Sequence, residues 1–423
     1  MTPEVKERIE QIRHGNVPEG YKRTTAGIVP NDWTECTLGD IYTERKEPGR
    51  EDLPLLMVSI HSGVSDGEVD EDDLPKKVKR IEDKTQYKRA ATGDLVFNMM
   101  RAWQGAIGTV RTEGMVSPAY IVAEPNGVVE PLFMDYYMKT ARMIHTIHRQ
   151  SYGVTDFRLR LYWDSFAPIR CVLPPVAEQS WIGELLSAQN KVIELKERLL
   201  AEKQRQKKYL MQQLLTGKKR LPGFDEGWKN TQLGQICKRT RKRNSVGNTN
   251  VMTISAQFGL INQEEFFHKA IASDDKSNYY LLYRDDFAYN KSYSSGYPYG
   301  AIKRLINYDS GIVSPLYICF RVKRNDVSVD YMEHYFESGL MNRELQSVAQ
   351  EGARNHGLLN IAVEDFFSAT ISLPPYDEQM AIAEILSTAE REIILLRQEL
   401  EQEKQKKKAL MQLLLMGIVR VNA

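Results

Sequence analysis

Residues 173–187 read LPPVAEQSWIGELLS and residues 373–387 read LPPYDEQMAIAEILS, so the chain repeats one pattern at an offset of 200 positions. The register continues without a gap to KKYLMQQLLTG at 207–217 and KKALMQLLLMG at 407–417. A long stretch of mixed sequence precedes each copy. This duplication predicts a molecule with pseudo-twofold symmetry, in which each globular stretch leads into one long helix.

The repeated segment has the heptad pattern of a coiled coil, with polar interruptions. Paired prolines precede each copy, and Gly217 and Gly417 follow the last apolar turn, where glycine commonly ends a helix. Twofold-related helices joined by a whole domain would run antiparallel. The predicted helix–helix interface consists of Ile182, Leu186, Ile193, Leu200, Leu214, Ile382, Leu386, Ile393, Leu400 and Leu414. The alternative is that each helix packs only on its own domain, but a helix of about 60 Å would extend beyond it.

The two globular stretches share a frame of short β-rich runs. DLVFN at 94–98 resembles DFAYN at 286–290, and SPAYIV at 117–122 resembles SPLYIC at 314–319. A helical segment follows in each, at 134–150 and 332–350. We therefore expect an α+β fold. The expected order is a first domain at 1–175, a helix at 176–217, a second domain at 218–375, and a helix with a C-terminal tail at 376–423.

Composition narrows the class of protein further. The formal net charge is +1, and no apolar run of about 18 residues could span a membrane. The N-terminus is charged and lacks the apolar core of a signal peptide. The cysteines Cys36, Cys171, Cys237 and Cys319 form no CxxC pair, which argues against a zinc site or a disulfide framework. We expect a cytoplasmic protein that does not contact a membrane.

The catalytic motifs that this sequence partly resembles are all incomplete. The proline pairs are LPPV and LPPY, not the NPPY-like element of amino-methyltransferases, and no GxGxxG follows a strand. The segment 216–219 lacks the glycine and the Ser or Thr of a phosphate-binding loop. We therefore predict no catalytic residue, no metal site and no cofactor in this chain. A standalone nuclease or methyltransferase with degenerate motifs is one alternative, and a coiled-coil scaffold without a DNA role is another.

The doubled order of LPPxxEQ and KKxLMQxLLxG resembles the specificity subunit of type I DNA restriction–modification systems. The resemblance covers essentially the whole chain, including the opening YKRTTAGIVPNDWTECTLGDI at 21–41. It implies two target recognition domains, each reading one half of a bipartite site in double-stranded DNA, with two helices that set the gap. It also implies two methyltransferase partner subunits that bind S-adenosylmethionine. Endonuclease and translocase subunits, which use ATP and magnesium, would complete the assembly.

Two loops in each domain carry side chains suited to DNA, which needs cations for phosphates and forked or amide groups for base edges. In the family that the chain resembles, corresponding loops face the DNA. The candidate DNA-contacting residues are Asn98, Met99, Arg101, Gln104, Thr155, Arg158 and Arg160 in the first domain, and Asn290, Lys291, Tyr293, Ser294, Arg354, Asn355 and His356 in the second. The alternative interpretation is ordinary turns with surface charges. The basic runs 76–80 and 238–243 are equally suited to phosphate contact or to a solvated surface.

Overall fold

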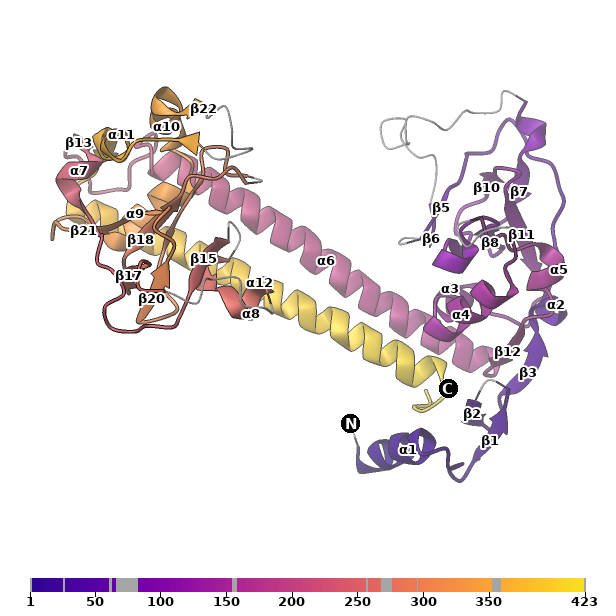
Figure 1. Cartoon of the computed structure of the whole chain (residues 1–423). Helices are drawn as coiled ribbons and strands as arrows, with labels where there is room; N and C mark the ends of the chain where they lie inside the picture. Colours follow the sequence, from indigo (N-terminus) through magenta and orange to yellow (C-terminus); the bar gives the residue numbers. More distant parts are fainter. Residues whose placement is uncertain are drawn as a thin grey trace. The chain divides into compact units, whose positions relative to one another are not determined.

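The chain divides into two compact units, the first built from two separate stretches of sequence and the second from one. The computed structural model describes residues 2–25, 27–60, 63–65, 83–153, 158–255, 258–267, 276–294, 296–351 and 359–421. The first unit is Met1–Glu197 with Glu399–Ala423, and the second is Arg198–Gln398. The long helices α6 (Val176–Leu214) and α12 (Tyr376–Leu415) each contribute to both units (Figure 1). Among the described residues, no helix is both long and apolar enough to cross a membrane.

The first unit is centred on a four-stranded antiparallel sheet. Its strands, in spatial order, are β4 (Tyr42–Glu44), β11 (Tyr120–Pro125), β8 (Leu95–Asn98) and β9 (Ile107–Thr109). The antiparallel pairs beside it are β1 (Tyr21–Thr24) with β2 (Gly27–Pro30), β3 (Thr34–Thr37) with β12 (Arg170–Leu173), β5 (Val58–Ser59) with β6 (Gly63–Val64), and β7 (Lys88–Ala90) with β10 (Gly114–Val116). Its other helices are α1 (Pro3–Arg13), α2 (Leu38–Ile41), η2 (Lys84–Gln86), η3 (Ala102–Gln104), α3 (Pro131–Tyr137), α4 (Ala141–Gln150) and α5 (Trp163–Phe166).

The second unit repeats this frame in the same strand order. Its central sheet runs β14 (Cys237–Arg239), β21 (Ile318–Val322), β18 (Phe287–Asn290) and β19 (Ala301–Arg304). The pairs are β13 (Lys229–Gln232) with β24 (Thr370–Leu373), β15 (Met252–Ser255) with β16 (Gly259–Asn262), β17 (Tyr280–Tyr283) with β20 (Ser310–Val313), and β22 (Gln350–Glu351) with β23 (Leu359–Asn360). The remaining helices are α7 (Leu233–Ile236), α8 (Gln263–Phe267), α9 (Val329–Glu337), α10 (Asn342–Val348) and α11 (Val363–Ser368).

Each central sheet is covered on both faces, which explains its continuous apolar strands. In β8, Phe97 lies in one buried cluster with Phe133 and Phe166, whereas its neighbour Val96 lies in another with Val122. Successive side chains of a strand point to opposite faces, so an all-apolar strand requires a core on each side. Fully burying one such side chain contributes about 1.5–3 kcal/mol. The mixed α+β content expected from the sequence is confirmed.

The helical segments after the sheets differ from the single helices expected. The prediction of one helix at 134–150 is wrong, because α3 ends at Tyr137 and α4 begins at Ala141. Thr140 caps α4, with its hydroxyl accepting from the Met143 amide at 3.3 Å. The expected helix at 332–350 is likewise divided into α9 and α10, with Gly339 at a φ of 77° between them. The N-cap at Thr140 divides one predicted helix and the left-handed Gly339 divides the other, although the apolar spacing of the sequence continues through both.

The two long helices contact each other within each unit. In the first unit, Gln189 Nε2 donates to Glu403 Oε2 at 2.7 Å, and Lys196 Nζ donates to Glu399 Oε2 at 2.8 Å. In the second unit, Lys203 Nζ donates to Glu392 Oε2 at 2.9 Å. The residue numbers of one helix therefore rise as those of its partner fall.

Candidate nucleic-acid interface

The start of α6 is fixed to the first unit by a buried carboxylate. Glu178 is 3% exposed, and its Oε2 accepts a hydrogen bond from Trp33 Nε1 at 3.2 Å. The guanidinium of Arg420 donates to both carboxylate oxygens of Glu178, at 2.7 and 2.8 Å. Arg420 also donates to Asp32, and this hydrogen bond holds the pKa of the Asp32 carboxyl below its usual value. We call Trp33, Glu178 and Arg420 the first clasp.

The second unit contains the same arrangement at the start of α12. Glu378 is fully buried and accepts from Trp228 Nε1 at 3.0 Å. Arg220 donates to its two oxygens at 2.7 and 2.8 Å. Trp228, Glu378 and Arg220 form the second clasp. A buried carboxylate is tolerated when it is paired and hydrogen-bonded in this way.

The repeat explains several residues whose roles the sequence left open. The sequence alone assigned no partner side chain to Arg220 or Arg420, whereas each pairs with the buried glutamate of its clasp. The available signal was that Arg220 and Arg420 also recur at an offset of 200. Gly417 is required by a close approach, since it has a φ of 68° and a Cβ there would lie 2.5 Å from Pro30 Cδ.

The glutamine of each LPPxxEQ motif bonds two backbone groups. One is the carbonyl of the first proline of the motif, and the other is the amide of the residue that precedes α3 or α9. Gln179 Nε2 donates to the Pro174 carbonyl at 2.9 Å, and its Oε1 accepts from the Glu130 amide at 2.9 Å. Gln379 makes the equivalent contacts with Pro374 at 2.9 Å and with Ser328 at 2.8 Å. The motif therefore orients each long helix against the helix that follows the central sheet.

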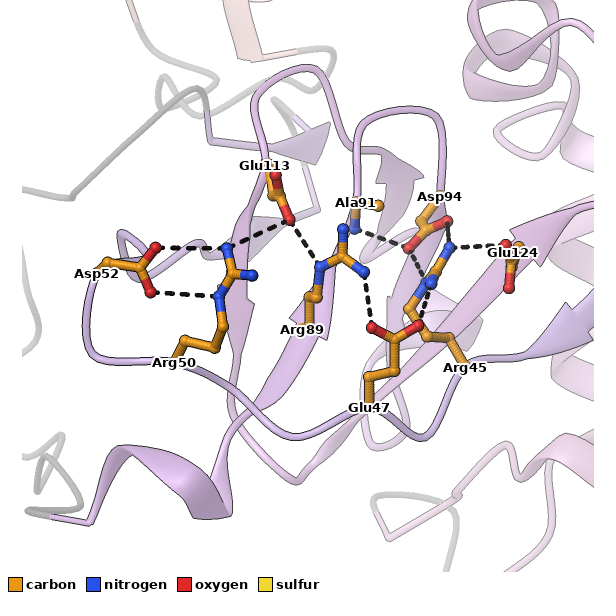
Figure 2. A network of polar contacts seen from close by, with 9 residues as sticks. All are labelled: Arg45, Glu47, Arg50, Asp52, Arg89, Ala91, Asp94, Glu113 and Glu124. Atoms are coloured by element: carbon orange, nitrogen blue, oxygen red, sulfur yellow. Dashed lines mark hydrogen bonds and ion pairs between the residues drawn. The ribbon is translucent and has the colours of Figure 1, made fainter.

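Figure 2 shows the ion-pair network that supports the β8 strand in the first unit. Asp94, at the start of the strand, is 1% exposed and accepts from Arg45 Nε at 2.7 Å and from the Ala91 amide at 2.8 Å. Burial raises the pKa of the Asp94 carboxyl, against the opposing effect of Arg45. Arg45 also pairs with Glu124 at 2.9 Å, and Arg89 joins Glu47 to Glu113.

The second unit supports β18 with a smaller set of contacts. Asp286 is fully buried, accepts from Arg321 Nε at 2.6 Å, and accepts from the Tyr283 amide at 2.8 Å. The aspartate of each Asp-x-x-x-Asn run is therefore a structural anchor. The asparagine at the far end of each run begins the candidate contact loop.

In the first unit, the contact loop follows β8 as a tight turn. Asn98 Oδ1 accepts from the Met100 amide at 2.9 Å, and the turn continues into η3. Trp103 Nε1 donates to the Met100 carbonyl at 3.0 Å, which fixes the half-buried indole. Arg101 and Gln104 are exposed. The guanidinium of Arg101 has no hydrogen bond or ion pair among the described residues, so it is available to an external anion or base.

A second segment of the first unit joins this loop. The Leu161 amide donates to the Met99 carbonyl at 2.9 Å, and Tyr152 and Arg160 exchange backbone hydrogen bonds at 3.0 and 2.9 Å. Gly153 is required there, because a Cβ would lie 2.3 Å from the carbonyl oxygen of Arg158. Arg158 and Arg160 are exposed. The structure therefore brings the two predicted loops of the first domain together.

In the second unit, the equivalent loop follows β18. Asn290 Oδ1 accepts from the Ser292 amide at 3.2 Å, and the Lys291 carbonyl accepts from the Leu359 amide at 3.0 Å. Lys291 is half-buried, and its Nζ donates to the Ile361 carbonyl at 3.4 Å. Tyr293 is 63% exposed, whereas Ser294 forms a turn with Tyr297. Tyrosine here replaces the exposed arginine of the first loop.

Several candidates lie outside the described residues: Thr155 in the first domain, Arg354, Asn355 and His356 in the second, and the basic run 76–80. The second basic run is partly paired, since Lys242 Nζ donates to the Tyr283 hydroxyl at 3.0 Å and Arg243 bonds Asn278. Within the described ranges, no group of three or more His, Cys, Asp or Glu residues is placed to hold a metal ion.

The predicted helix–helix residues are distributed between the two units. In the first, Ile182, Leu186 and Leu414 share one buried cluster with β-sheet residues. In the second, Ile382, Leu386 and Leu214 share another. Farther along the helices, Ile393 and Leu400 are buried, whereas Ile193 and Leu200 are half-buried.

The sequence matches a known family over much of its second half. Residues 225–405 match the family described as the type I restriction modification DNA specificity domain. A relative from Methanocaldococcus jannaschii, assigned as the MjaX specificity subunit of a type I restriction enzyme, is 22% identical over 450 residues. That match covers 95% of this chain and 97% of the relative.

Solved structures of similar fold cover nearly the whole chain. The HsdS subunit from Thermoanaerobacter tengcongensis matches with a TM-score of 0.50 and 18% identity, over 92% of this chain and 98% of that chain. The S subunit of a type I restriction–modification system from M. genitalium matches with a TM-score of 0.52 and 10% identity, over 92% and 96%. The chain thus has the fold of these subunits and carries a DNA specificity domain. The chain is similar to type I restriction–modification specificity subunits in sequence and in fold, and residues 225–405 match their DNA specificity domain. These similarities do not favour a standalone enzyme or a scaffold without a DNA role.

Proposed function

We propose that this chain reads a bipartite site in double-stranded DNA and has no catalytic activity of its own. One domain contacts each half-site, and both domains present a loop at the same place in the same sheet frame. The observation that carries the proposal is that the two loops share a frame but differ in their exposed side chains. The frame residues Asn98 and Asn290 are shared, whereas the exposed side chains that follow are Arg101 and Gln104 in one loop and Tyr293 in the other.

The chemistry of the first loop fits base reading. A guanidinium can donate two hydrogen bonds to O6 and N7 of guanine in the major groove, and a glutamine amide can pair with adenine. Arg158 and Arg160, on the adjoining segment, are suited to phosphates, since cations at the backbone supply affinity that depends on salt. Asn98 and Met99 position the loop through backbone and Asx-turn contacts rather than reading bases.

In the second loop, the same roles fall on different residues. Tyr293 offers an exposed ring and hydroxyl, and Ser294 lies beside it. Lys291 serves a phosphate, because its ammonium lies between the loop and the 359–361 segment. Thr155, Arg354, Asn355 and His356 lie outside the described residues, and we keep them in the proposal as DNA-contacting residues because of their sequence positions.

The arrangement of the domains is part of the proposal. The two target recognition domains are related by a pseudo-twofold axis and are separated by the helices, which form an antiparallel coiled coil. Supporting this are the inverse residue numbering of the helix contacts in both units and the repetition of the clasp. The length of the coiled coil sets the gap between the half-sites.

The partners are those of a multi-subunit enzyme. Two methyltransferase subunits, which carry S-adenosylmethionine, dock on this chain, and endonuclease and translocase subunits add ATP and magnesium. This chain holds none of these cofactors. A cytoplasmic location completes the proposal, because the four cysteines form no CxxC pair and their spacing does not suggest a disulfide framework.

Two experiments test the proposal. The purified chain is incubated with DNA and S-adenosylmethionine, with and without the methyltransferase, and methylation should require both proteins. Methyl transfer by the chain alone, free of other subunits, would contradict it. Methylation mapping of DNA from cells that contain both subunits should return two short specified sequences separated by a constant unspecified gap. A single continuous site would overturn the bipartite reading.

A further inference from the structure

Two cysteines that are distant in the sequence face each other in the first unit. Cys36 on β3 and Cys171 on β12 are directly paired residues of an antiparallel strand pair. Their sulfur atoms lie 3.4 Å apart, and both thiols are free. Directly opposed residues of antiparallel strands have Cα atoms about 4.5–5.5 Å apart. This separation falls inside the range of about 4.4–6.8 Å that disulfides span, so a bond requires side-chain movement only.

The two thiols differ in access and in acidity. Cys36 is half-buried, whereas Cys171 is fully buried. The hydrogen bond from Cys171 lowers the pKa of the Cys36 thiol, and the same contact together with burial raises the pKa of Cys171. Because the thiolate is the reactive form, an external reagent meets Cys36 first.

We propose that Cys36 and Cys171 form a dithiol modification site that a small-molecule disulfide, such as oxidised glutathione, converts to an intramolecular disulfide. The Cys36 thiolate attacks one sulfur of the reagent, forms a mixed disulfide and releases one thiolate. Cys171 then loses its proton and attacks the Cys36 sulfur, which releases the second small thiol. Two protein thiols are oxidised, and one reagent disulfide is reduced to two thiols.

The position of the site connects it to the first clasp. β12 leads through Pro174 and Pro175 into α6 at Val176, and Trp33, which bonds Glu178, directly precedes β3. A bond between these strands closes a loop of residues 135 apart in sequence. Such a crosslink restricts the unfolded chain, so it should stabilise the first unit against unfolding.

The second unit lacks the site. Its equivalent strand pair, β13 with β24, places Thr231 opposite Ile371. The other two cysteines are also buried away from a thiol partner, since Cys237 is opposite Val322 and Cys319 is opposite Ala288. Oxidation would therefore alter the first unit alone.

The test uses the full purified chain, treated with oxidised glutathione and mapped by mass spectrometry of peptides under non-reducing conditions. We expect the peptides that contain Cys36 and Cys171 to be joined, with Cys237 and Cys319 still reduced. The Cys171→Ala variant should stop at a glutathione adduct on Cys36, and Cys36→Ser should leave Cys171 unmodified. Oxidised wild type should unfold at a higher temperature, a shift that a reducing agent reverses and Cys36→Ser abolishes.

Three results would overturn the proposal. The first is a folded wild-type chain in which Cys36 accumulates as the glutathione adduct without crosslinking. The second is a crosslink that involves Cys237 or Cys319. The third is a folded chain in which neither thiol reacts under conditions that modify the urea-unfolded chain. None of these measurements involves DNA or a methyltransferase, so their outcome is independent of the proposed function.

Discussion

The clasps and the contact loops differ in how strictly the duplication preserves them. The tryptophan–glutamate distance is 3.2 Å in the first clasp and 3.0 Å in the second, and both arginines bond their glutamate at 2.7 and 2.8 Å. After Asn98 and Asn290, however, the exposed side chains of the two loops have little in common. Buried, fully paired groups are retained because each partner depends on the others. Exposed groups change freely, which fits the proposal that the two loops read different half-sites.

The largest expected effect comes from breaking one clasp. Arg220→Ala removes the counter-ion of the buried Glu378 carboxylate, so the second unit should lose several times more unfolding free energy than the control variant below. Urea denaturation of the full chain measures the loss. The matched control is Glu184→Ala, an exposed carboxylate on α6, which should change stability by less than about 0.5 kcal/mol. Equal, small effects of both variants would show that the clasp does not stabilise the second unit.

Acid should destabilise the second unit more than the first. The reason is that a buried histidine, His334, occupies the position that Tyr136 occupies in the first unit. His334 is 8% exposed, and its Nε2 lies 2.9 Å from Ser387 Oγ, whereas Tyr136 in the first unit bonds Asn190. Burial, with a contribution from Lys207, lowers the pKa of His334 to about 4 from 6.5. Glu390, Asp330 and Glu337 face it and act in the opposite direction.

The sign of the pH dependence follows from this lowered pKa. As the pH falls below 6.5, the unfolded chain binds a proton that the folded His334 does not, so stability declines until about pH 4. The total loss is about 3 kcal/mol, at about 1.4 kcal/mol for each pH unit. Urea midpoints at a series of pH values should show this decline for one transition, and His334→Gln should flatten it. An unchanged pH profile in that variant would contradict the assignment.

A smaller effect is expected from the first contact loop. Arg101→Ala should lower DNA affinity by about 1–3 kcal/mol if the guanidinium reads guanine, and should relax one base of one half-site. Competition binding with oligonucleotides varied one base at a time, in the presence of the methyltransferase, measures both quantities. Arg13→Ala on α1, with a side chain that is 68% exposed, is the matched loss of one positive charge. Identical behaviour of the two variants would show that Arg101 is not a base reader.

The smallest effect is expected from Lys291→Ala. Its half-buried ammonium is suited to one phosphate, so affinity should fall evenly across all sequences. The slope of log K against log salt should become shallower by about one. Titrations at several salt concentrations measure this slope. A change of base preference instead would show that Lys291 contacts a base and not a phosphate.

The repeat predicted the parts of the fold that depend on local pattern. The helices α6 and α12 begin directly after the paired prolines, and the shared β-rich runs became the central strands β8 and β18. The division of 134–150 into two helices was missed because an N-cap at Thr140 interrupts an apolar spacing that continues through it.

The contacts that join distant residues could not be predicted from one sequence. Glu178 and Arg420 are 242 positions apart, and no local pattern connects them. The same holds for Cys36 and Cys171, which appeared as scattered cysteines. The candidate loops could be located by their frame, whereas the free guanidinium of Arg101 and the engaged ammonium of Lys291 became distinguishable only with side chains in place.

Methylation mapping of cells that carry wild type, Arg101→Ala or Tyr293→Ala, each with the methyltransferase, measures whether each domain reads its own half-site. We expect Arg101→Ala to relax sequence preference in one half-site only and Tyr293→Ala in the other half-site only, with an unchanged gap. Relaxation of both half-sites by a single variant, or of the same half-site by both, would contradict the claim that each domain reads its own half.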